Sequence, residues 1–196
     1  MSKNELDYDW LVLGSGFGGS VSALRLAEKG YKVAVIEAGK RYRDDEHAKS
    51  AWDLRRFLWA PSLGLHGIFR LTPFKDAFFA SGTAVGGGSV VYANTLYRAR
   101  PEFYENPQWK GLDDWQNVLA PHYAEAERML GVQEVPRESV GQKLLRKVGE
   151  HFGVPETFKR STVVVFFCEP VVNVEDPYFV GEGPSRTGCT YCGACM

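Results

Sequence analysis

Several features that mark common protein classes are missing from this sequence of 196 residues. No apolar run approaches the roughly 18 residues that a bilayer-spanning helix needs. The start, MSKNELDYDW, is acidic and lacks the basic and apolar regions of a signal peptide. The 23 basic and 24 acidic residues nearly cancel, and no basic run indicates a nucleic-acid partner. We therefore expect a cytoplasmic protein with no transmembrane segment and no nucleic-acid partner.

Cysteine is also scarce, and its placement excludes a small disulfide scaffold. Cys189, Cys192 and Cys195 form a C-x₂-C-x₂-C run at the end of the chain, and Cys168 stands apart. In a reducing compartment this spacing indicates metal binding or redox chemistry. An iron–sulfur centre, a zinc site and plain thiols in a glycine-rich turn all stay open. We expect no bound metal in the chain as given, because three ligands at a terminus make a poor site.

Hydrophobic periodicity predicts a strand, a helix and a second strand within the first 40 residues. Residues 9–13 and 32–39 are apolar and strand-like, and residues 18–30 repeat apolar side chains at helical spacing before a stop at Gly30. This order is the βαβ unit of an α/β fold. Three side chains of the second strand are expected to be buried: Val33, Val35 and Ile36.

Less regular signals follow in the rest of the chain. Residues 119–131 predict a helix with Pro121 at its first position, and residues 139–153 predict another. Residues 89–92 and 161–167 look like strands. Aromatic residues gather between positions 57 and 79, where they form either a lid over an apolar substrate or part of the core: Phe57, Trp59, Phe69, Phe74, Phe78 and Phe79.

The turn between the first strand and the helix has the form G-x-G-x-x-G at residues 14–19. Gly14 allows a tight turn, Gly16 lets the backbone approach a pyrophosphate, and Gly19 lets the helix and strand pack closely. The pyrophosphate would lie on N–H groups at the positive end of the helix dipole. A strand–helix turn without a ligand is the alternative, and the complete βαβ unit argues against it.

An acidic residue at the end of the second strand completes this motif. Glu37 follows 18 residues after Gly19, where its carboxylate can accept two hydrogen bonds from ribose hydroxyls. A carboxylate there repels the 2′-phosphate of NADP. The wider spacing of small residues, with Ala23 and Gly30 after Gly19, favours FAD over NAD.

A second glycine-rich stretch, GTAVGGGSVVYAN at residues 82–94, contains Gly86, Gly87 and Gly88 in a row. Each glycine loses more backbone entropy on folding than any other residue, so three together need a reason. A tight turn on the surface is one reason. A backbone whose N–H groups closely approach a bound ligand is the other, and the first motif favours it.

The two glycine motifs together resemble those of the glucose–methanol–choline (GMC) oxidoreductases, in the branch of the bacterial cholesterol oxidases. The similarity is carried by the sequence from residue 7 to 42, by GTAVGGGSVVYANTLY, and by the segments SAWDLRRFLWAPSLGLHGI and GPSRTGCTYCGACM. It implies an α/β fold: a Rossmann-like FAD-binding domain, incomplete here, interleaved with part of an α+β substrate domain.

The resemblance also implies an enzyme that oxidises an alcohol by transferring hydride to flavin N5. A 3β-hydroxysterol such as cholesterol is the favoured substrate, with O₂ as the acceptor, and such a substrate leaves a peripheral position at a membrane open. Two alternatives remain. One is a flavin dehydrogenase that passes electrons to a carrier, and the other is a truncated fragment that binds a nucleotide without catalysis.

The resemblance assigns the cofactor-binding residues by position. Phe17, Gly18 and Glu37 would hold the ADP half of FAD, and residues 86–89 would flank the flavin. The full set of expected FAD-binding residues is Gly14, Ser15, Gly16, Phe17, Gly18, Gly19, Glu37, Gly82, Val85, Gly86, Gly87, Gly88, Ser89 and Asn94.

Two positions depart from the family pattern. The asparagine that the family carries three residues after the motif serine is Tyr92 here, and Asn94 lies two residues later. Members with covalent flavin carry histidine at the position of Val91, so we expect dissociable FAD. The family's catalytic histidine lies beyond residue 196. No catalytic residue is therefore assigned, and the four histidines match no motif: His47, His66, His122 and His151.

The expected organisation has three parts. Residues 1–44 begin the FAD-binding domain. Residues 45–110 hold a lid-like segment and the flavin-contacting glycine loop at 80–94. Residues 111–196 form a helical and loop segment that leads towards the substrate domain, and the chain is expected to be an N-terminal fragment.

Overall fold

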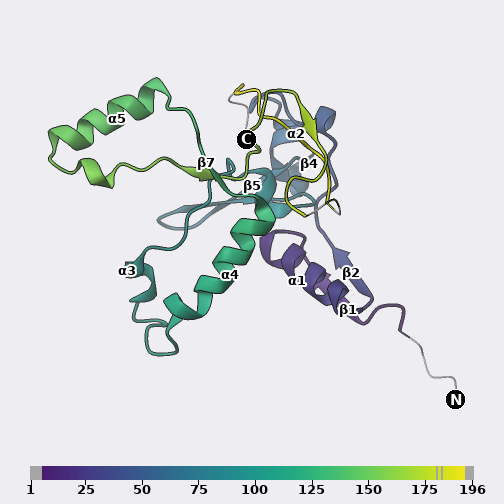
Figure 1. The fold of residues 1–196 in the computed structure, drawn as a ribbon. Helices are drawn as coiled ribbons and strands as arrows, with labels where there is room; N and C mark the ends of the chain where they lie inside the picture. The colour runs from purple at the N-terminus through teal and green to yellow at the C-terminus, as the bar shows by residue number, and fades with distance from the viewer. Residues whose placement is uncertain (1–5, 180, 182, 193–196) are drawn as a thin grey trace, which may run out of the picture. The chain divides into compact units, whose positions relative to one another are not determined.

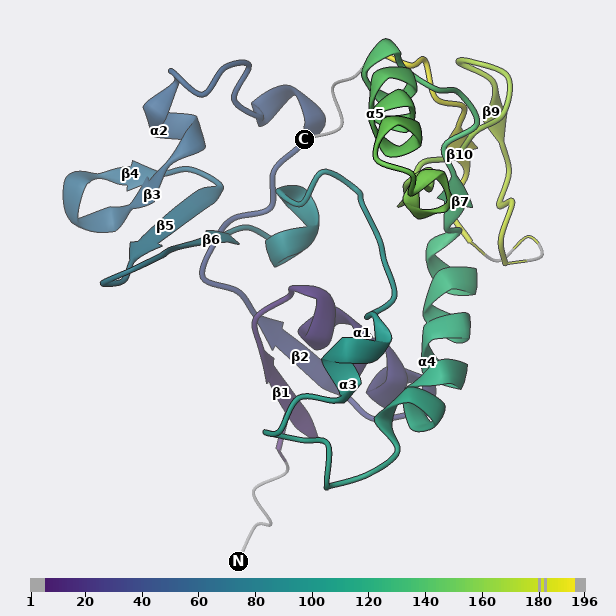
Figure 2. The ribbon, with the colours of Figure 1, turned by 90° about the vertical axis from the view of Figure 1, so that its left-hand side faces the viewer.

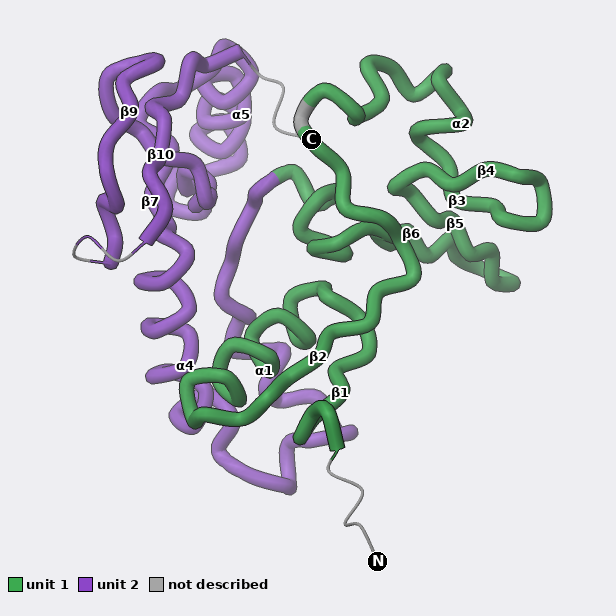
Figure 3. The backbone as a smooth tube through the Cα atoms, turned by 90° about the vertical axis from the view of Figure 1, so that its right-hand side faces the viewer, with its two compact units in different colours: residues 1–93, 196 green, residues 94–195 purple. Residues whose placement is uncertain are grey.

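The computed structural model describes residues 6–179, 181 and 183–192 of the chain, whose path is drawn in Figure 1. The chain divides between Ala93 and Asn94 into two compact units, coloured separately in Figure 3. The domain boundaries predicted after residues 44 and 110 stay predictions.

The first unit begins with the predicted βαβ element, which is confirmed. Strand β1 (Trp10–Leu13) leads into helix α1 (Phe17–Glu28), and strand β2 (Val33–Ile36) follows. The two strands pair in parallel along their whole length, and α1 packs against them (Figure 2). The helix stops where the sequence predicted, because Gly30 has a φ of 85° and its N–H donates to the Ala27 carbonyl at 2.8 Å.

The expected burial of the second strand is not found. Val33 is half-buried, but Val35 and Ile36 are 44% and 54% exposed, and Leu13 of the neighbouring strand is 80% exposed. A parallel sheet needs cover on both faces. Two strands and one helix do not provide it.

Short strands and 3₁₀ turns make up the rest of the first unit. They are the 3₁₀ helices Asp44–Glu46 and Pro61–Leu63, helix α2 (Leu54–Phe57), and strands β3 (Trp59–Ala60), β4 (Leu65–His66), β5 (Phe69–Pro73) and β6 (Phe78–Gly82). Strands β3 and β4 pair antiparallel, as do β5 and β6. The best buried side chains of this unit lie around the end of these strands: Ile68, Thr83 and Ala84.

The aromatic segment divides into two parts. The rings of Phe57 and Phe69 stack with centroids 5.2 Å apart, and both side chains are half-buried. By contrast, Phe74, Phe78 and Phe79 are 64%, 78% and 62% exposed. The first part therefore acts as core, while the lid remains a prediction for the exposed part.

The strand predicted at residues 89–92 is wrong. A 3₁₀ helix at Gly87–Val90 stands there instead. Gly86 and Gly87 have φ angles of 107° and 54°, in the left-handed region that turns the chain back on itself. Local bonds then close the turn: the N–H of Ser89 donates to the Gly86 carbonyl at 3.1 Å, and that of Val91 to the Gly88 carbonyl at 3.1 Å.

The second unit consists of helices and small two-stranded sheets. Its elements are α3 (Pro101–Tyr104), α4 (Trp115–Leu130), β7 (Gln133–Glu134), α5 (Val140–His151), the 3₁₀ helix Pro155–Thr157, β8 (Thr162–Val163), β9 (Asn173–Val174) and β10 (Arg186–Thr187). Strands β7 and β8 pair antiparallel, and so do β9 and β10. Of the strand predicted at 161–167, only residues 162–163 are therefore formed.

The start of α4 corrects another prediction. Pro121 was expected at the first helical position, but it lies inside the helix. The carboxylate of Asp114 accepts a bond from the Asn117 N–H at 3.4 Å, which fixes the start one turn and a half earlier. The helix ends at Gly131, whose φ is 67°. No helix of the described residues is long and apolar enough to span a membrane.

Candidate nucleotide-binding site

The first glycine loop connects β1 to α1 and has the geometry that its motif predicts. Gly14 has a φ of 90°, which lets the chain turn sharply at the end of the strand. A Cβ added at Gly19 would collide with the carbonyl oxygen of Gly14 and would lie 3.3 Å from the side chain of Val12. Only glycine therefore lets the helix start so close to the strand.

Helix α1 begins without a side-chain cap. Its N-cap residue is Gly16, no side chain of the described residues bonds to the first N–H groups, and no acid lies in the first turn. The first N–H groups of an α-helix have no partner within the helix. A Cβ added at Gly16 would meet its nearest atom only at 3.8 Å, and one at Gly18 would meet nothing within 4 Å. The helix start thus offers donors and open space to an anion.

Glu37 lies just after β2 and receives bonds from the same loop. Its Oε2 accepts from the backbone N–H and the hydroxyl of Ser15, both at 2.8 Å, and its Oε1 accepts from the Gly39 N–H at 3.1 Å. Burial raises the pKa of this carboxyl, but the bonds from Ser15 and Gly39 outweigh it and lower the pKa below 4.5. A carboxylate offers about four acceptor positions, and the protein's own donors occupy most of them.

The second glycine loop packs directly on the first. A Cβ added at Gly87, which is buried, would lie 2.7 Å from Cα of Gly16. The N–H of Gly86 donates to Oγ of Ser15 at 3.0 Å, and the N–H of Val85 donates to the Lys40 carbonyl at 3.1 Å. The two motifs, about 70 residues apart in sequence, therefore form one glycine-lined surface.

The triple glycine is needed partly for this contact inside the protein. The N–H of Gly86 is engaged by Ser15, and that of Gly87 donates to the Ala84 carbonyl at 2.8 Å. Among the described residues, the N–H of Gly88 alone of the three has no such bond. Fewer N–H groups of this loop are available to a ligand than the sequence suggested.

An aromatic pair borders the loops. The ring of Phe17, which is 46% exposed, meets the ring of Tyr92 edge to face, with centroids 5.2 Å apart. A Cβ added at Gly88 would lie 3.2 Å from the Phe17 ring. Burial raises the pKa of the Tyr92 hydroxyl.

Of the predicted residues, only Asn94 belongs to the second unit. It is the first residue of the second unit, and its carbonyl accepts a bond from the Val164 N–H at 3.2 Å. Gly82 lies beneath the second loop, where an added Cβ would collide with the Gly87 carbonyl, and the exposed hydroxyl of Ser89 donates to the Gly86 carbonyl at 2.9 Å. All the other predicted residues belong to the first unit.

Sequence reasoning missed residues 83–84, which pack against the chain just after β2. Thr83 and Ala84 are 6% and 1% exposed. An added Cβ at Gly39 would collide with the Thr83 carbonyl oxygen. These two small residues lie shortly before the triple glycine, and small side chains in a glycine-rich stretch were a signal that its first part is closely packed.

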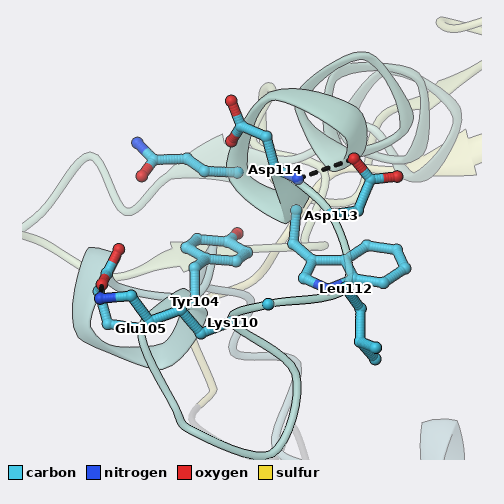
Figure 4. Close-up of a pocket in the computed structure, with 9 residues that line it drawn as sticks. Tyr104, Glu105, Lys110, Leu112, Asp113 and Asp114 are labelled. Atoms are coloured by element: carbon cyan, nitrogen blue, oxygen red, sulfur yellow. Dashed lines mark hydrogen bonds and ion pairs between the residues drawn. The ribbon is translucent and has the colours of Figure 1, made fainter.

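A hollow in the second unit is lined by several carboxylates, and each of them already has a partner within the protein. In the second unit, a hollow of about 380 Å³ is lined by Tyr104, Asp113 and Asp114, among others (Figure 4). Its Glu105 is paired with Lys110. Asp113 accepts from the Asp114 N–H at 2.8 Å, while Asp114 caps α4. These carboxylates serve the protein's own turns.

The cysteines do not assemble a metal centre within the described residues. Cys168 and Cys189 are half-buried free thiols, and Cys192 is exposed. No group of three or more His, Cys, Asp or Glu side chains is placed to hold a metal ion in the described part of the chain. Cys195 lies outside it, so the absence of a bound metal stays a prediction.

A parallel βαβ unit with a G-x-G-x-x-G turn, an open helix start and an acid after the second strand defines a dinucleotide-binding fold of the Rossmann type. Residues 8–163 match the family model of the GMC oxidoreductases. The chain belongs to this family, which is generally flavin-dependent, as the resemblance predicted.

Relatives agree with this assignment. The chain is 50% identical over 195 residues to a cholesterol oxidase of Mycobacterium tuberculosis (strain ATCC 25618 / H37Rv), covering 97% of this chain and 34% of the relative. It is 47% identical over 200 residues to a cholesterol oxidase of Acinetobacter baumannii, covering 100% and 36%. A 2-methyl-1,2-propanediol dehydrogenase of Mycolicibacterium austroafricanum is 30% identical over 136 residues, covering 63% and 24%. The chain thus spans about a third of the length of the cholesterol oxidases it matches.

Proposed function

We propose that the two glycine loops bind FAD, and that the protein to which this chain belongs oxidises an alcohol with it. The observation that carries the proposal is the uncapped start of α1 at Gly16, which lies against the second glycine loop. Donors at the positive end of a helix suit a pyrophosphate. The loops leave space where a Cβ at Gly16 or Gly18 would stand, which fits a cofactor that approaches the backbone closely.

Each part of the site has a role towards the cofactor in this proposal. The N–H groups at the start of α1 hold the pyrophosphate, and Glu37 accepts a bond from a ribose hydroxyl. The second loop, with the N–H of Gly88, faces the flavin half. When bound, FAD would supply the acceptor for the hydride of the alcohol carbon. The side chains of this region position the cofactor, and none of them is assigned a proton transfer.

We propose a 3β-hydroxysterol as the alcohol and O₂ as the electron acceptor. Support comes from the identity to two cholesterol oxidases over nearly the whole chain. The exposed rings of Phe74, Phe78 and Phe79 give this region an apolar surface that suits a sterol. The similarity to an alcohol dehydrogenase keeps electron transfer to a carrier as the second candidate.

The experiment uses the full-length protein. Its flavin is released by heat and identified by chromatography, and cholesterol oxidation is followed by O₂ consumption in air and by reduction of a dye under argon. The proposal expects about one FAD per chain and H₂O₂ formation with cholesterol. Dye reduction without O₂ consumption would identify the dehydrogenase instead, and a protein that binds no flavin would refute the proposal.

A further inference from the structure

The hydroxyl of Ser15 joins three segments that are far apart in the sequence. It donates to Oε2 of Glu37 at 2.8 Å, across 22 residues, and it accepts from the N–H of Gly86 at 3.0 Å, across 71 residues. The backbone N–H of Ser15 donates to the same Glu37 oxygen at 2.8 Å. A chain of hydrogen bonds therefore runs from Glu37 through Ser15 to the second glycine loop.

These bonds use up the donor of the side chain. A serine hydroxyl has one proton to donate and two lone pairs that accept. The O–H of Ser15 donates to Glu37, and one lone pair of its oxygen accepts from the N–H of Gly86. The hydroxyl has no proton left for a phosphate oxygen, so its effect on a cofactor passes through Glu37 and Gly86.

Both partners of Ser15 belong to the surfaces that a dinucleotide would meet. Glu37 is the acid at the end of β2, and Gly86 opens the triple glycine that packs on Gly16. The hydroxyl thus sets the orientation of the carboxylate and the position of the second loop at the same time. A site that is already ordered before binding avoids the entropy cost of ordering it with the ligand.

We propose that Ser15 is a positioning residue that locks Glu37 and the second glycine loop into one preformed cradle for FAD. The inference rests on the proposed function, because it takes FAD as the ligand of the two loops. It adds a residue whose side chain acts on the cofactor indirectly, through a bridge between the two motifs.

The test compares variants of the full-length protein, freed of flavin and titrated with FAD by fluorescence. Ser15→Ala removes the bridge, and Ser15→Thr keeps a hydroxyl at the same place. Ser20→Ala is the matched control, because the Ser20 hydroxyl is exposed and bonds only to the carbonyls of Gly16 and Phe17 in its own helical turn. The same Ser15→Ala change is also made in a Glu37→Gln background. Circular dichroism checks that each variant is folded.

We expect Ser15→Ala to weaken FAD binding about tenfold, Ser15→Thr to restore it to within about threefold, and Ser20→Ala to leave it unchanged. In the Glu37→Gln background, the Ser15→Ala effect should shrink to less than about threefold, because the two residues act as one unit. Unchanged FAD affinity in Ser15→Ala, or the same effect in both backgrounds, would overturn the inference. A wild-type protein that binds no FAD would refute the proposed function instead.

Discussion

At the start of helices α4 and α5, a side chain bonds to one of the first backbone N–H groups. Helix α1 instead begins at Gly16, and no side chain of the described residues bonds to its first N–H groups. Asp114 accepts from the Asn117 N–H at 3.4 Å, and Ser139 accepts from the Gln142 N–H at 3.2 Å. The side chain of Gln142 in turn accepts from the Ser139 N–H at 2.7 Å, which completes a capping box. Each of these caps satisfies one backbone N–H group at the start of its helix. Among the described residues no side chain does so at the start of α1, and in the proposed function its donors bind the pyrophosphate.

The two units also differ in the contacts that join segments far apart in the sequence. In the second unit, Arg98 makes a two-pronged ion pair with Glu127, at 2.7 and 2.6 Å, on partly exposed side chains. Exposed pairs of this kind contribute about 0–1 kcal/mol. In the first unit, the backbone of Gly87 lies directly on that of Gly16. Substitution of the Arg98–Glu127 pair should therefore be tolerated better than substitution of Gly87.

The largest effect is expected for Gly87→Val. The new Cβ would lie 2.7 Å from Cα of Gly16, and valine would have to adopt a φ of 54°. Overpacking and a left-handed β-branched residue together cost roughly 2–5 kcal/mol. The variant should lose FAD and also unfold at lower temperature in its flavin-free form. A variant that loses FAD but melts like the wild type would mean that the residue faces only the ligand.

Gly16→Ala should lower FAD affinity without lowering the stability of the flavin-free protein. An alanine Cβ there meets its nearest protein atom at 3.8 Å. The free energy of unfolding of the flavin-free variant should therefore lie within about 0.5 kcal/mol of the wild-type value. The same Cβ would stand where the pyrophosphate approaches, so FAD affinity should fall by more than about tenfold. Fluorescence titration and thermal unfolding measure the two quantities on one sample. An unchanged affinity would place the cofactor elsewhere.

Glu37→Gln should weaken FAD binding about tenfold, because it removes one charge-assisted bond of about 1.5–3 kcal/mol to the ribose. The lowered pKa of Glu37 adds a pH dependence. Its carboxylate stabilises the folded state fully above its ordinary pKa, and this contribution is lost as the pH falls through the lowered pKa. The stability difference between the wild type and the variant should therefore shrink on acidification, and a constant difference would contradict the account.

Ser139→Ala is expected to have the smallest effect on FAD affinity and is the matched counterpart in the second unit. Loss of its cap costs about 0.5–2 kcal/mol of stability, without any change in FAD affinity. Urea unfolding and flavin titration of the full-length variant check both expectations. A marked loss of flavin would show that α5 takes part in the site.

The sequence predicted the parts of the site that depend on local pattern. The βαβ unit and the turn at Gly14 follow from periodicity and from a known motif, and both are found. The contact of Gly87 with Gly16 and the bridge through Ser15 join residues about 70 positions apart. No local pattern encodes such contacts. The strand expected at residues 89–92 failed for a local reason, because the left-handed Gly86 and Gly87 turn the chain into the 3₁₀ helix Gly87–Val90.

Two other failures have different physical causes. Pro121 favours a helix start by its fixed φ, but the cap at Asp114 and the further turns outweigh the one donor that proline lacks. Val35 and Ile36 are apolar enough to be buried, yet burial depends on a covering layer that two strands and a helix do not provide. In both cases the residue's own preference was outweighed by its surroundings.

The central claim is that the open start of α1 binds the pyrophosphate of a dinucleotide. The most direct measurement is calorimetric titration of the flavin-free, full-length protein with ADP and with adenosine at low salt. If phosphate groups sit on the N–H groups at Gly16–Gly19, ADP should bind about tenfold more tightly than adenosine or better. Equal affinities for ADP and adenosine would contradict the account.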